Sequence, residues 1–275
     1  MKIPKSVLYI GKFLEFLSPR LAALYAAKLF ATPFKHKIPK RELEMDQKSS
    51  QQILRVPAIN KEIVVYQCGN SDKKVLLVHG WSGRGTQLFK IADELLQNGY
   101  STLSFDAPAH GKSAGNTTLL PEFVATILEI QKQYGPIEFA IGHSLGSMSI
   151  LRALTEGLIV KKAVIIGSGD VIQDIIDDFL RKLKLSKKVG LLMKKHFEKK
   201  SGTSMEQLSS YVSAKQITLP VLILHDKNDD DVPFSCSINI QKHLKGSELV
   251  LTTNLGHRKI LGEKTVIDKI INYLK

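Results

Sequence analysis

Short apolar segments rich in β-branched residues recur along most of the chain, and longer stretches with apolar residues at helical spacing separate them. The predicted strands cover residues 63–67, 75–79, 101–105, 137–142, 163–167, 221–225 and 248–252. The predicted helices cover residues 86–98, 121–134, 145–156 and 263–274. Strands that are apolar on both faces are typical of a parallel sheet covered by helices on both sides. The pattern therefore predicts an α/β fold with a mostly parallel central sheet.

Two segments do not follow this alternation. Residues 1–45 have the pattern of one or two amphipathic helices, which we expect to form an arm packed on the domain; a helix on a membrane surface is the alternative. Residues 170–219 place about 50 residues between two predicted neighbouring strands, far more than an ordinary connection. We interpret them as a small helical cap, whose apolar residues pack on the sheet, line an acyl pocket or form a partner surface. The sequence thus predicts a helical arm over residues 1–48 and a domain over residues 49–275 with the cap at about 170–219.

Positive charge is concentrated in these two segments. The chain of 275 residues has a formal net charge of +13; residues 1–48 contribute +6 and residues 181–200 contribute +8, so the remainder is close to neutral. Such blocks are solvated faces, or they attract an anionic lipid surface or an acidic substrate. Because no nucleic-acid recognition motif accompanies them and aromatic residues make up only 7%, we expect no nucleic-acid partner.

Cysteine usage and hydropathy bear on the location of the protein. Cys68 and Cys236 lie far apart and share no motif, which excludes a disulfide scaffold and a cysteine-based zinc site and fits a reducing compartment. The chain has no run of about 18 apolar residues that would predict a membrane-spanning helix. Charged residues interrupt every candidate signal peptide near the N-terminus. We therefore expect a cytoplasmic protein.

The most specific local motif is Gly142-His143-Ser144-Leu145-Gly146, which directly follows a predicted strand and precedes a helical pattern. This context is typical of a nucleophile elbow, in which a tight turn lifts the serine hydroxyl clear of the backbone. The flanking glycines let strand and helix approach closely, and the helix N-terminus favours developing negative charge. A serine hydroxyl becomes nucleophilic when a base takes its proton, and a histidine oriented by a carboxylate suits that task near neutral pH.

Further motifs follow other predicted strands. They are His79-Gly80-Trp81, the segment 106–113 (DAPAHGKS), Asp229-Asp230-Asp231-Val232-Pro233 and Gly256-His257. With these motifs in this order, residues 60–275 resemble the serine hydrolases of the α/β-hydrolase superfamily. The resemblance implies the α/β-hydrolase fold and a triad of Ser144, Asp229 and His257, in the chain order expected for that fold. All three residues follow predicted strands, whose carboxyl ends converge at one edge of a parallel sheet.

Other residues compete for two of these roles. Asp231 is the next candidate for the acid, and Asp170, after another strand, is a further one. The alternative histidines for the base are His225, His243, His143, His79 and His110. The sequence also departs from the family pattern, because Asp226 follows His225 where glycine is usual and Ala109 stands where glycine is common. The first change places an extra carboxylate near the acid.

The oxyanion of an acyl-transfer reaction needs hydrogen-bond donors that already point at the developing charge. The backbone N–H of Leu145, next to Ser144, is one candidate, and the resemblance implies the backbone N–H of Trp81 as the other. The Trp81 ring either lines the acyl pocket or packs in the core.

The sequence predicts neither a cofactor nor a metal. Gly111-Lys112-Ser113 resembles the end of a phosphate-binding loop, but Asp106 occupies the position of its first glycine. Gly167-Ser168-Gly169 resembles a dinucleotide fingerprint, but Ile172 occupies the position of its third glycine. The eight histidines have no metal-ligand spacing.

Together these features predict a hydrolase that cleaves a small-molecule carboxylic ester or thioester through an acyl-Ser144 intermediate. An amide, peptide or C–C bond hydrolase of the same fold is the first alternative, because the triad is shared and the insertion sets the substrate. A non-catalytic binding scaffold is the second. Peripheral contact of the lysine-rich segments with an anionic membrane also remains open, and the sequence does not indicate the oligomeric state.

Overall fold

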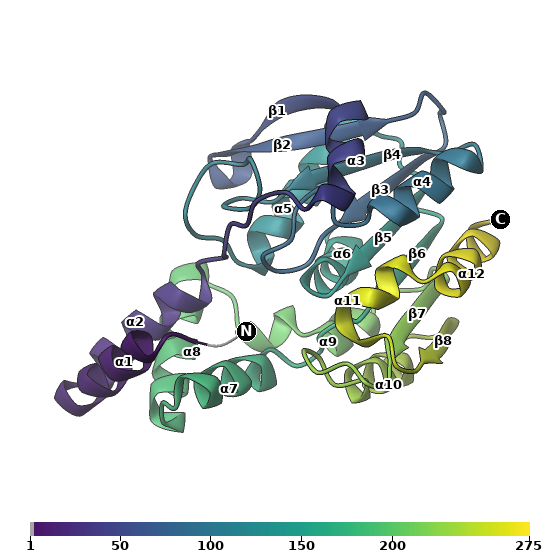
Figure 1. The fold of residues 1–275 in the computed structure, drawn as a ribbon. Helices are drawn as coiled ribbons and strands as arrows, with labels where there is room; N and C mark the ends of the chain where they lie inside the picture. Colours follow the sequence, from purple (N-terminus) through teal and green to yellow (C-terminus); the bar gives the residue numbers. More distant parts are fainter. Residues whose placement is uncertain (1–2) are drawn as a thin grey trace.

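A central sheet of eight strands with helices on both faces forms the body of the protein, in a computed structural model that describes residues 3–275 (Figure 1). The strand order is β1-β2-β4-β3-β5-β6-β7-β8. The strands are β1 (Ser50–Val56), β2 (Lys61–Cys68), β3 (Lys74–Val78), β4 (Ser101–Asp106), β5 (Phe139–His143), β6 (Lys162–Ile166), β7 (Val221–Asp226) and β8 (Ser247–Thr252). Only β2 runs against the others, since it pairs antiparallel with both β1 and β4. The predicted mostly parallel α/β sheet is confirmed.

The edge strand β1 was not among the predicted strands. It pairs with β2 along its whole length, from Ser50 opposite Gln67 to Val56 opposite Lys61. Most of its side chains are exposed, and Ile53 is 72% exposed. The strand is therefore held by its ladder with β2 and carries little of the apolar pattern that marks the buried strands.

Two apolar layers hold the helices against the sheet. On β3, Leu76 and Val78 face one layer, while Val75 and Leu77 face the other. The first layer includes α5 (Leu120–Tyr134), α6 (Leu145–Thr155) and α10 (Ser235–His243). The second includes α3 (Leu43–Lys48), α4 (Phe89–Gln97) and α12 (Lys264–Leu274). Because strands β3 to β8 run parallel, the loops at their carboxyl ends lie at one edge of the sheet.

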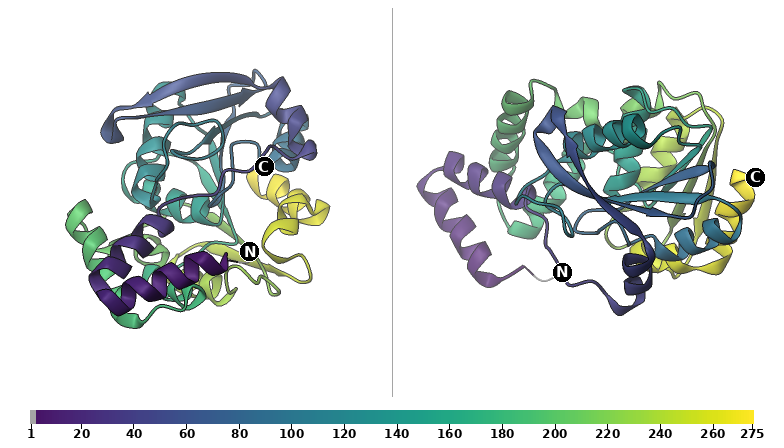
Figure 2. Two further views of the ribbon diagram at one scale, coloured as in Figure 1. Left: turned by 60° about the vertical axis from the view of Figure 1, so that its left-hand side comes forward. Right: turned by 90° about the horizontal axis from the view of Figure 1, so that it is seen from above.

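The N-terminal arm is a hairpin of two helices at one end of the molecule. It consists of α1 (Lys5–Leu17) and α2 (Pro19–Phe30), and it lies beside the cap helices α7 (Ile172–Leu183) and α8 (Lys187–Ser201) (Figure 2). The short elements η3 (Met205–Leu208) and α9 (Ser210–Ala214) complete the insertion.

The apolar side of the arm packs on the cap. The Phe30 ring lies 5.2 Å from the Phe179 ring and 5.9 Å from the Phe197 ring, measured between centroids. Four buried alanines of α2 let the helices approach closely: Ala22, Ala23, Ala26 and Ala27. No helix within residues 3–275 is long and apolar enough to span a bilayer.

The connection from the arm to the sheet runs along the loops that follow β3 and β4. The Phe34 N–H donates a hydrogen bond to Ser82 Oγ (3.0 Å), and Lys35 Nζ donates to the Ser113 carbonyl (2.7 Å). Further on, Asp46 pairs with Lys112 at 2.5 Å. The arm segment is thus attached both to the cap and to the loops at the carboxyl edge of the sheet.

Candidate active site

Ser144 lies on a strained turn between β5 and α6. Its φ of 54° is in a region that non-glycine residues adopt rarely, at a cost of about 1–3 kcal/mol. The turn is held on both sides, because the Ser144 N–H donates to the Ile166 carbonyl (2.9 Å) and the Ser144 carbonyl accepts from the Ser147 N–H (3.0 Å). The Ser144 hydroxyl itself forms no hydrogen bond with any residue in the range 3–275. The turn therefore presents an unengaged hydroxyl at the N-terminus of α6.

Two glycines allow the strand and the helix to meet at this turn. A β-carbon on Gly142 would lie 2.7 Å from backbone atoms of Gly146, and one on Gly146 would lie 2.3 Å from the Val78 carbonyl oxygen. Both distances are shorter than any real contact of a β-carbon, so no side chain fits at either position without moving backbone. The elbow motif thus has a packing reason for each of its glycines.

Asp229 and His257 are brought together from the loops that follow β7 and β8. His257 Nδ1 lies 2.6 Å from Asp229 Oδ2, and the Asp229 side chain is fully buried. The N–H groups of Asp231 and Val232 both donate to Asp229 Oδ1. Burial alone would raise the pKa of Asp229, but the hydrogen bonds from His225, His257 and the Val232 N–H outweigh burial and hold this pKa well below its usual range. Asp229 is therefore an ionised acceptor that orients the His257 ring.

His143 connects the elbow to the His257 loop. His143 Nε2 lies 2.9 Å from the His257 carbonyl oxygen, and the two ring centroids are 4.5 Å apart. Burial lowers the pKa of His143 to about 3, so its ring is neutral and Nε2–H is the donor. Gly167, directly after β6, leaves room for this contact, because a β-carbon there would lie 3.2 Å from His257 Nδ1. The candidate base thus lies against the residue that precedes Ser144.

No hydrogen bond joins the Ser144 hydroxyl to His257 in the described part of the chain. Catalytic hydrogen bonds are often long in unliganded enzymes and shorten when substrate binds.

The competing acids have other partners. Asp170 accepts hydrogen bonds from the Tyr211 N–H (2.8 Å) and from Asn239 Nδ2 (2.6 Å), and burial raises its pKa. Asp231 is exposed and lies 3.6 Å from Arg258. Neither carboxylate contacts His257.

The competing histidines likewise support loops. His225 Nε2 lies 3.0 Å from the Val232 carbonyl and 3.4 Å from Asp229 Oδ2, so this ring supports the acid. His79 accepts from the Ala107 N–H and His110 accepts from the Ser82 N–H, each at 3.0 Å. Burial lowers the pKa of His79 to about 4 and that of His110 to about 3, so both are neutral. His243 Nδ1 lies 2.9 Å from the Asn239 carbonyl in α10.

Within the described residues, two backbone N–H groups near Ser144 have no acceptor. A β-carbon on Gly80 would lie 3.0 Å from Ser144 Cβ, so the loop after β3 passes directly beside the serine. In this loop the N–H groups of Gly80 and Ser82 are bonded to Gln87 and His110, whereas the Trp81 N–H between them donates to no residue within 3–275. The N–H of Leu145, the first residue of α6, is equally free over the same residues.

The Trp81 side chain is half-buried, and its ring packs edge-on against the His110 ring at 5.4 Å.

Asp226 has a role that the motifs did not predict. Its carboxylate accepts hydrogen bonds from Thr252 Oγ1 (2.7 Å) and from the N–H groups of Leu255 (3.1 Å), Gly256 (3.0 Å) and Asn228 (3.0 Å). Thr252 is the last residue of β8, and the three N–H donors lie in the two loops that carry Asp229 and His257. The only sequence signal was the unusual carboxylate after His225, since backbone donors leave no side-chain pattern.

Asp226→Asn is expected to lower the free energy of unfolding by about 1–3 kcal/mol at pH 7, because donors to a buried carboxylate lose their partner. Burial alone would raise the pKa of Asp226, but its hydrogen bonds outweigh burial and lower this pKa below 3.8. Ionisation of Asp226 therefore stabilises the fold above the pKa of the unfolded chain, and this contribution disappears as the pH falls through the lower folded value. Urea unfolding between pH 7 and pH 3 should show the difference from wild type shrinking below about pH 4.

Asp268→Asn is the matched control, because Asp268 pairs with Lys264 on the exposed face of α12. We expect it to change the free energy of unfolding by less than about 0.5 kcal/mol. If Asp226→Asn were as stable as wild type at pH 7, the anchoring role of Asp226 would be wrong.

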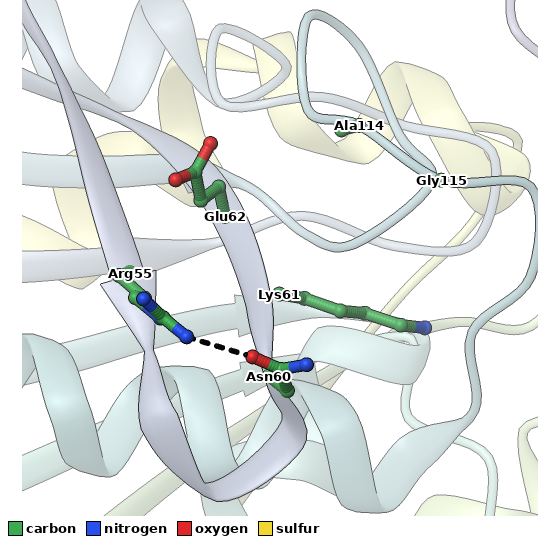
Figure 3. Close-up of a pocket in the computed structure, with 6 residues that line it drawn as sticks. All are labelled: Arg55, Asn60, Lys61, Glu62, Ala114 and Gly115. Carbon is green, nitrogen blue, oxygen red and sulfur yellow. Dashed lines mark hydrogen bonds between the residues drawn. The ribbon is translucent and has the colours of Figure 1, made fainter.

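A surface hollow of about 420 Å³ lies away from these residues (Figure 3). It is lined by Arg55, Asn60, Lys61, Glu62, Ala114 and Gly115. None of them is a candidate catalytic residue, and Arg55 and Asn60 are hydrogen-bonded to each other at 3.0 Å. In the described part of the chain, no three His, Cys, Asp or Glu side chains are arranged to hold a metal ion.

Known proteins resemble this chain in sequence and in fold. The AB hydrolase superfamily protein YisY of Bacillus subtilis is 26% identical, over 72% of this chain and 90% of the relative. An esterase from Exiguobacterium antarcticum superposes with a TM-score of 0.65 at 19% identity, over 82% of this chain and 99% of the esterase. The 2-hydroxy-6-oxo-6-phenylhexa-2,4-dienoate hydrolase from Rhodococcus superposes with a TM-score of 0.62 at 17% identity, over 82% and 98%. At these identities the structural likeness shows the fold alone.

The sequence profile of the Alpha/beta hydrolase family matches residues 75–258. This range includes Ser144, the loop after β3, the cap, and the loops that carry Asp229 and His257. The matched range and the observed sheet agree, and the chain belongs to the alpha/beta hydrolase family.

Proposed function

We propose that the protein is a serine hydrolase that cleaves a carboxylic ester or thioester through an acyl-Ser144 intermediate. The observation that carries the proposal is the 2.6 Å contact between His257 Nδ1 and the buried Asp229, beside an elbow serine whose hydroxyl is unengaged. A carboxylate at Nδ1 fixes the tautomer that leaves Nε2 free to accept a proton. The Trp81 and Leu145 N–H groups add two unpaired donors near the same serine.

The reaction follows from these groups. His257 Nε2 takes the proton of Ser144 Oγ while Oγ attacks the carbonyl carbon, and the Trp81 and Leu145 N–H groups receive the negative charge that develops on the carbonyl oxygen. Collapse of the tetrahedral intermediate breaks the bond to the leaving group, which takes the proton from His257. Water then attacks the acyl carbon while it gives a proton to the same nitrogen. Collapse of the second tetrahedral intermediate breaks the bond to Ser144 Oγ, which takes that proton back from His257 as the acid product leaves. Asp229 remains ionised throughout, in keeping with its low pKa.

The class of bond that is cleaved is a separate question from the identity of the nucleophile. An esterase is among the similar structures, but a hydrolase of a phenylhexadienoate shares the same fold. A shared fold does not fix the bond that is cleaved. Substrate assays therefore decide between esters and the amide, peptide or C–C alternatives.

Covalent labelling tests the proposal. A fluorophosphonate probe is expected to form an adduct with the folded wild-type protein, and peptide mapping should place the adduct on Ser144. Nitrophenyl esters of graded acyl length should then be hydrolysed, with the preferred length reporting the acyl pocket. Folded protein without an adduct at Ser144 would favour the binding-scaffold alternative. An adduct at Ser144 without turnover of any ester would move the proposal to amide, peptide or C–C substrates.

A further inference from the structure

The outward face of α1 exposes large apolar side chains. Phe16 is 87% exposed, Tyr9 72% and Phe13 62%, and at helical spacing these three residues share one face with Ile10 and Leu17. Two further leucines, Leu21 and Leu24, are exposed on α2. Figure 2 shows the hairpin projecting at one end of the molecule, away from the sheet. Continuous apolar surface of this kind is unusual on a water-exposed protein and marks a contact site.

These side chains are not exposed because the hairpin fails to pack on the rest of the chain. The opposite face of the hairpin is already covered, because Gly11 packs against Leu185 and Phe30 packs between Phe179 and Phe197. The hairpin is therefore folded and placed by the cap, and its outer face is left for something else.

Nine basic side chains of α2 and the cap have no counter-ion within residues 3–275. Arg20 and Lys28 are exposed on α2, which packs along α8. The cap adds Lys184, Lys187, Lys188, Lys194, Lys195, Lys199 and Lys200. Within residues 3–275, none of these nine side chains has a carboxylate within 4.0 Å, whereas Lys12 pairs with Glu15 and Lys182 pairs with Asp178. The arm and the cap helices lie at the same end of the molecule (Figure 1), so these unpaired basic side chains belong to one end of the protein.

We propose that the outer face of the α1–α2 hairpin, together with the lysines of α8, docks on an anionic lipid bilayer. Aromatic and aliphatic side chains enter the headgroup boundary, while nearby lysines attract acidic headgroups at about 1 kcal/mol each. A second copy of the chain is the poorer occupant, since a symmetric contact would bring the two lysine clusters together. The segment after α2 is hydrogen-bonded to Ser82 in the loop after β3, so the docking surface is joined to the carboxyl edge of the sheet that carries Ser144.

Vesicle co-sedimentation of the full chain tests this surface. Wild type is expected to bind vesicles of phosphatidylcholine mixed with phosphatidylglycerol, to bind pure phosphatidylcholine at least about tenfold more weakly, and to dissociate as salt is raised. The triple variant Lys187→Gln/Lys188→Gln/Lys195→Gln should bind the anionic vesicles about 100-fold more weakly, from the loss of about 1 kcal/mol per lysine. The double variant Phe13→Ser/Phe16→Ser should bind them at least about tenfold more weakly.

Matched controls separate docking from general surface effects. Ile53→Ser/Ile159→Ser removes two apolar side chains that are 72% and 78% exposed elsewhere. Lys73→Gln/Lys132→Gln/Lys245→Gln removes three exposed lysines outside the arm and cap. Both controls should bind vesicles like wild type, and circular dichroism should show all variants folded.

Three outcomes would overturn the proposal. The first is equal binding to neutral and anionic vesicles, and the second is a Phe13→Ser/Phe16→Ser protein that binds like its control. The third is that wild type does not bind vesicles at low salt. If light scattering then shows that wild type is a dimer and that Phe13→Ser/Phe16→Ser is a monomer, the face binds a second copy of the chain. None of these results depends on whether Ser144 is catalytic, so the docking surface and the proposed function fail separately.

Discussion

Ser144→Ala is expected to lower kcat for ester hydrolysis by at least about three orders of magnitude while leaving the fold intact. The change removes the atom that would form the acyl bond, and loss of a nucleophile in a Ser-His-Asp site leaves only the assistance of oxyanion donors and binding. Alanine keeps the β-carbon of serine, so the strained turn at φ 54° meets no new contact. Nitrophenyl ester turnover by purified protein measures the effect.

Ser213→Ala is the matched control, because the Ser213 hydroxyl is buried in the cap and has no hydrogen-bond partner in the described chain. It should hydrolyse esters within a few-fold of wild type. Equal rates for wild type and Ser144→Ala would refute the nucleophile assignment, and thermal melting of both proteins excludes unfolding as the cause of a loss.

Asp229→Asn is expected to lower kcat by about 10³–10⁴, the size of effect that the same change has in other serine triads. An amide in place of the carboxylate presents an N–H to His257 Nδ1 and favours the tautomer that cannot take the Ser144 proton. It also leaves a developing imidazolium without its counter-charge, at a position where the side chain is fully buried. Steady-state kinetics at neutral pH, with the fluorophosphonate labelling rate as a second measure, detect the loss.

Asp231→Asn distinguishes the acid assignment from its nearest competitor. Asp231 lies in the same loop, is exposed and contacts Arg258, so its variant should keep activity within a few-fold of wild type. A large loss in Asp231→Asn with normal turnover in Asp229→Asn would transfer the role of the acid to Asp231.

The buried strands were predictable because their surroundings impose a pattern. Strands β3, β5, β6 and β7 have helices on both faces, so almost every position is apolar. Strand β1 was not predicted because it lies at an edge of the sheet and most of its side chains are exposed. Its backbone pairing with β2 holds it in place, and almost any side chain permits that pairing. The helix predicted from residue 86 begins at Phe89, because residues 86–88 form the preceding turns.

The motif residues were predictable for a related reason. Ser144, Asp229 and His257 each follow a recognisable strand within a characteristic local pattern, so sequence placed all three at one edge of the sheet. The residues that support them act through backbone atoms. Gln87 bonds the Gly80 N–H and Asp226 bonds three N–H groups, and neither contact imposes a residue type on its partner.

The packing of the arm on the cap could not be predicted from the helical spacing of apolar residues. Helical spacing predicted both elements, but Phe30 and Phe179 are distant along the chain, and nothing in either helix names its partner. The apolar residues of α1 lie on two faces of the helix, and the sequence does not show which face packs on the cap. The exposure of the outer face was therefore not predictable either.

The packing of the arm on the cap also means that the arm is synthesised before the helices that cover it. The hairpin that ends at Phe30 leaves the ribosome long before α7 and α8, because four α-helices and six strands lie between them in the chain. Until then the side of the hairpin that packs on the cap is uncovered as well as the outer face of α1, a state that favours aggregation of the nascent chain. Growing polypeptides of this protein should therefore need shielding by a chaperone or early capture by a lipid surface more than the finished molecule does.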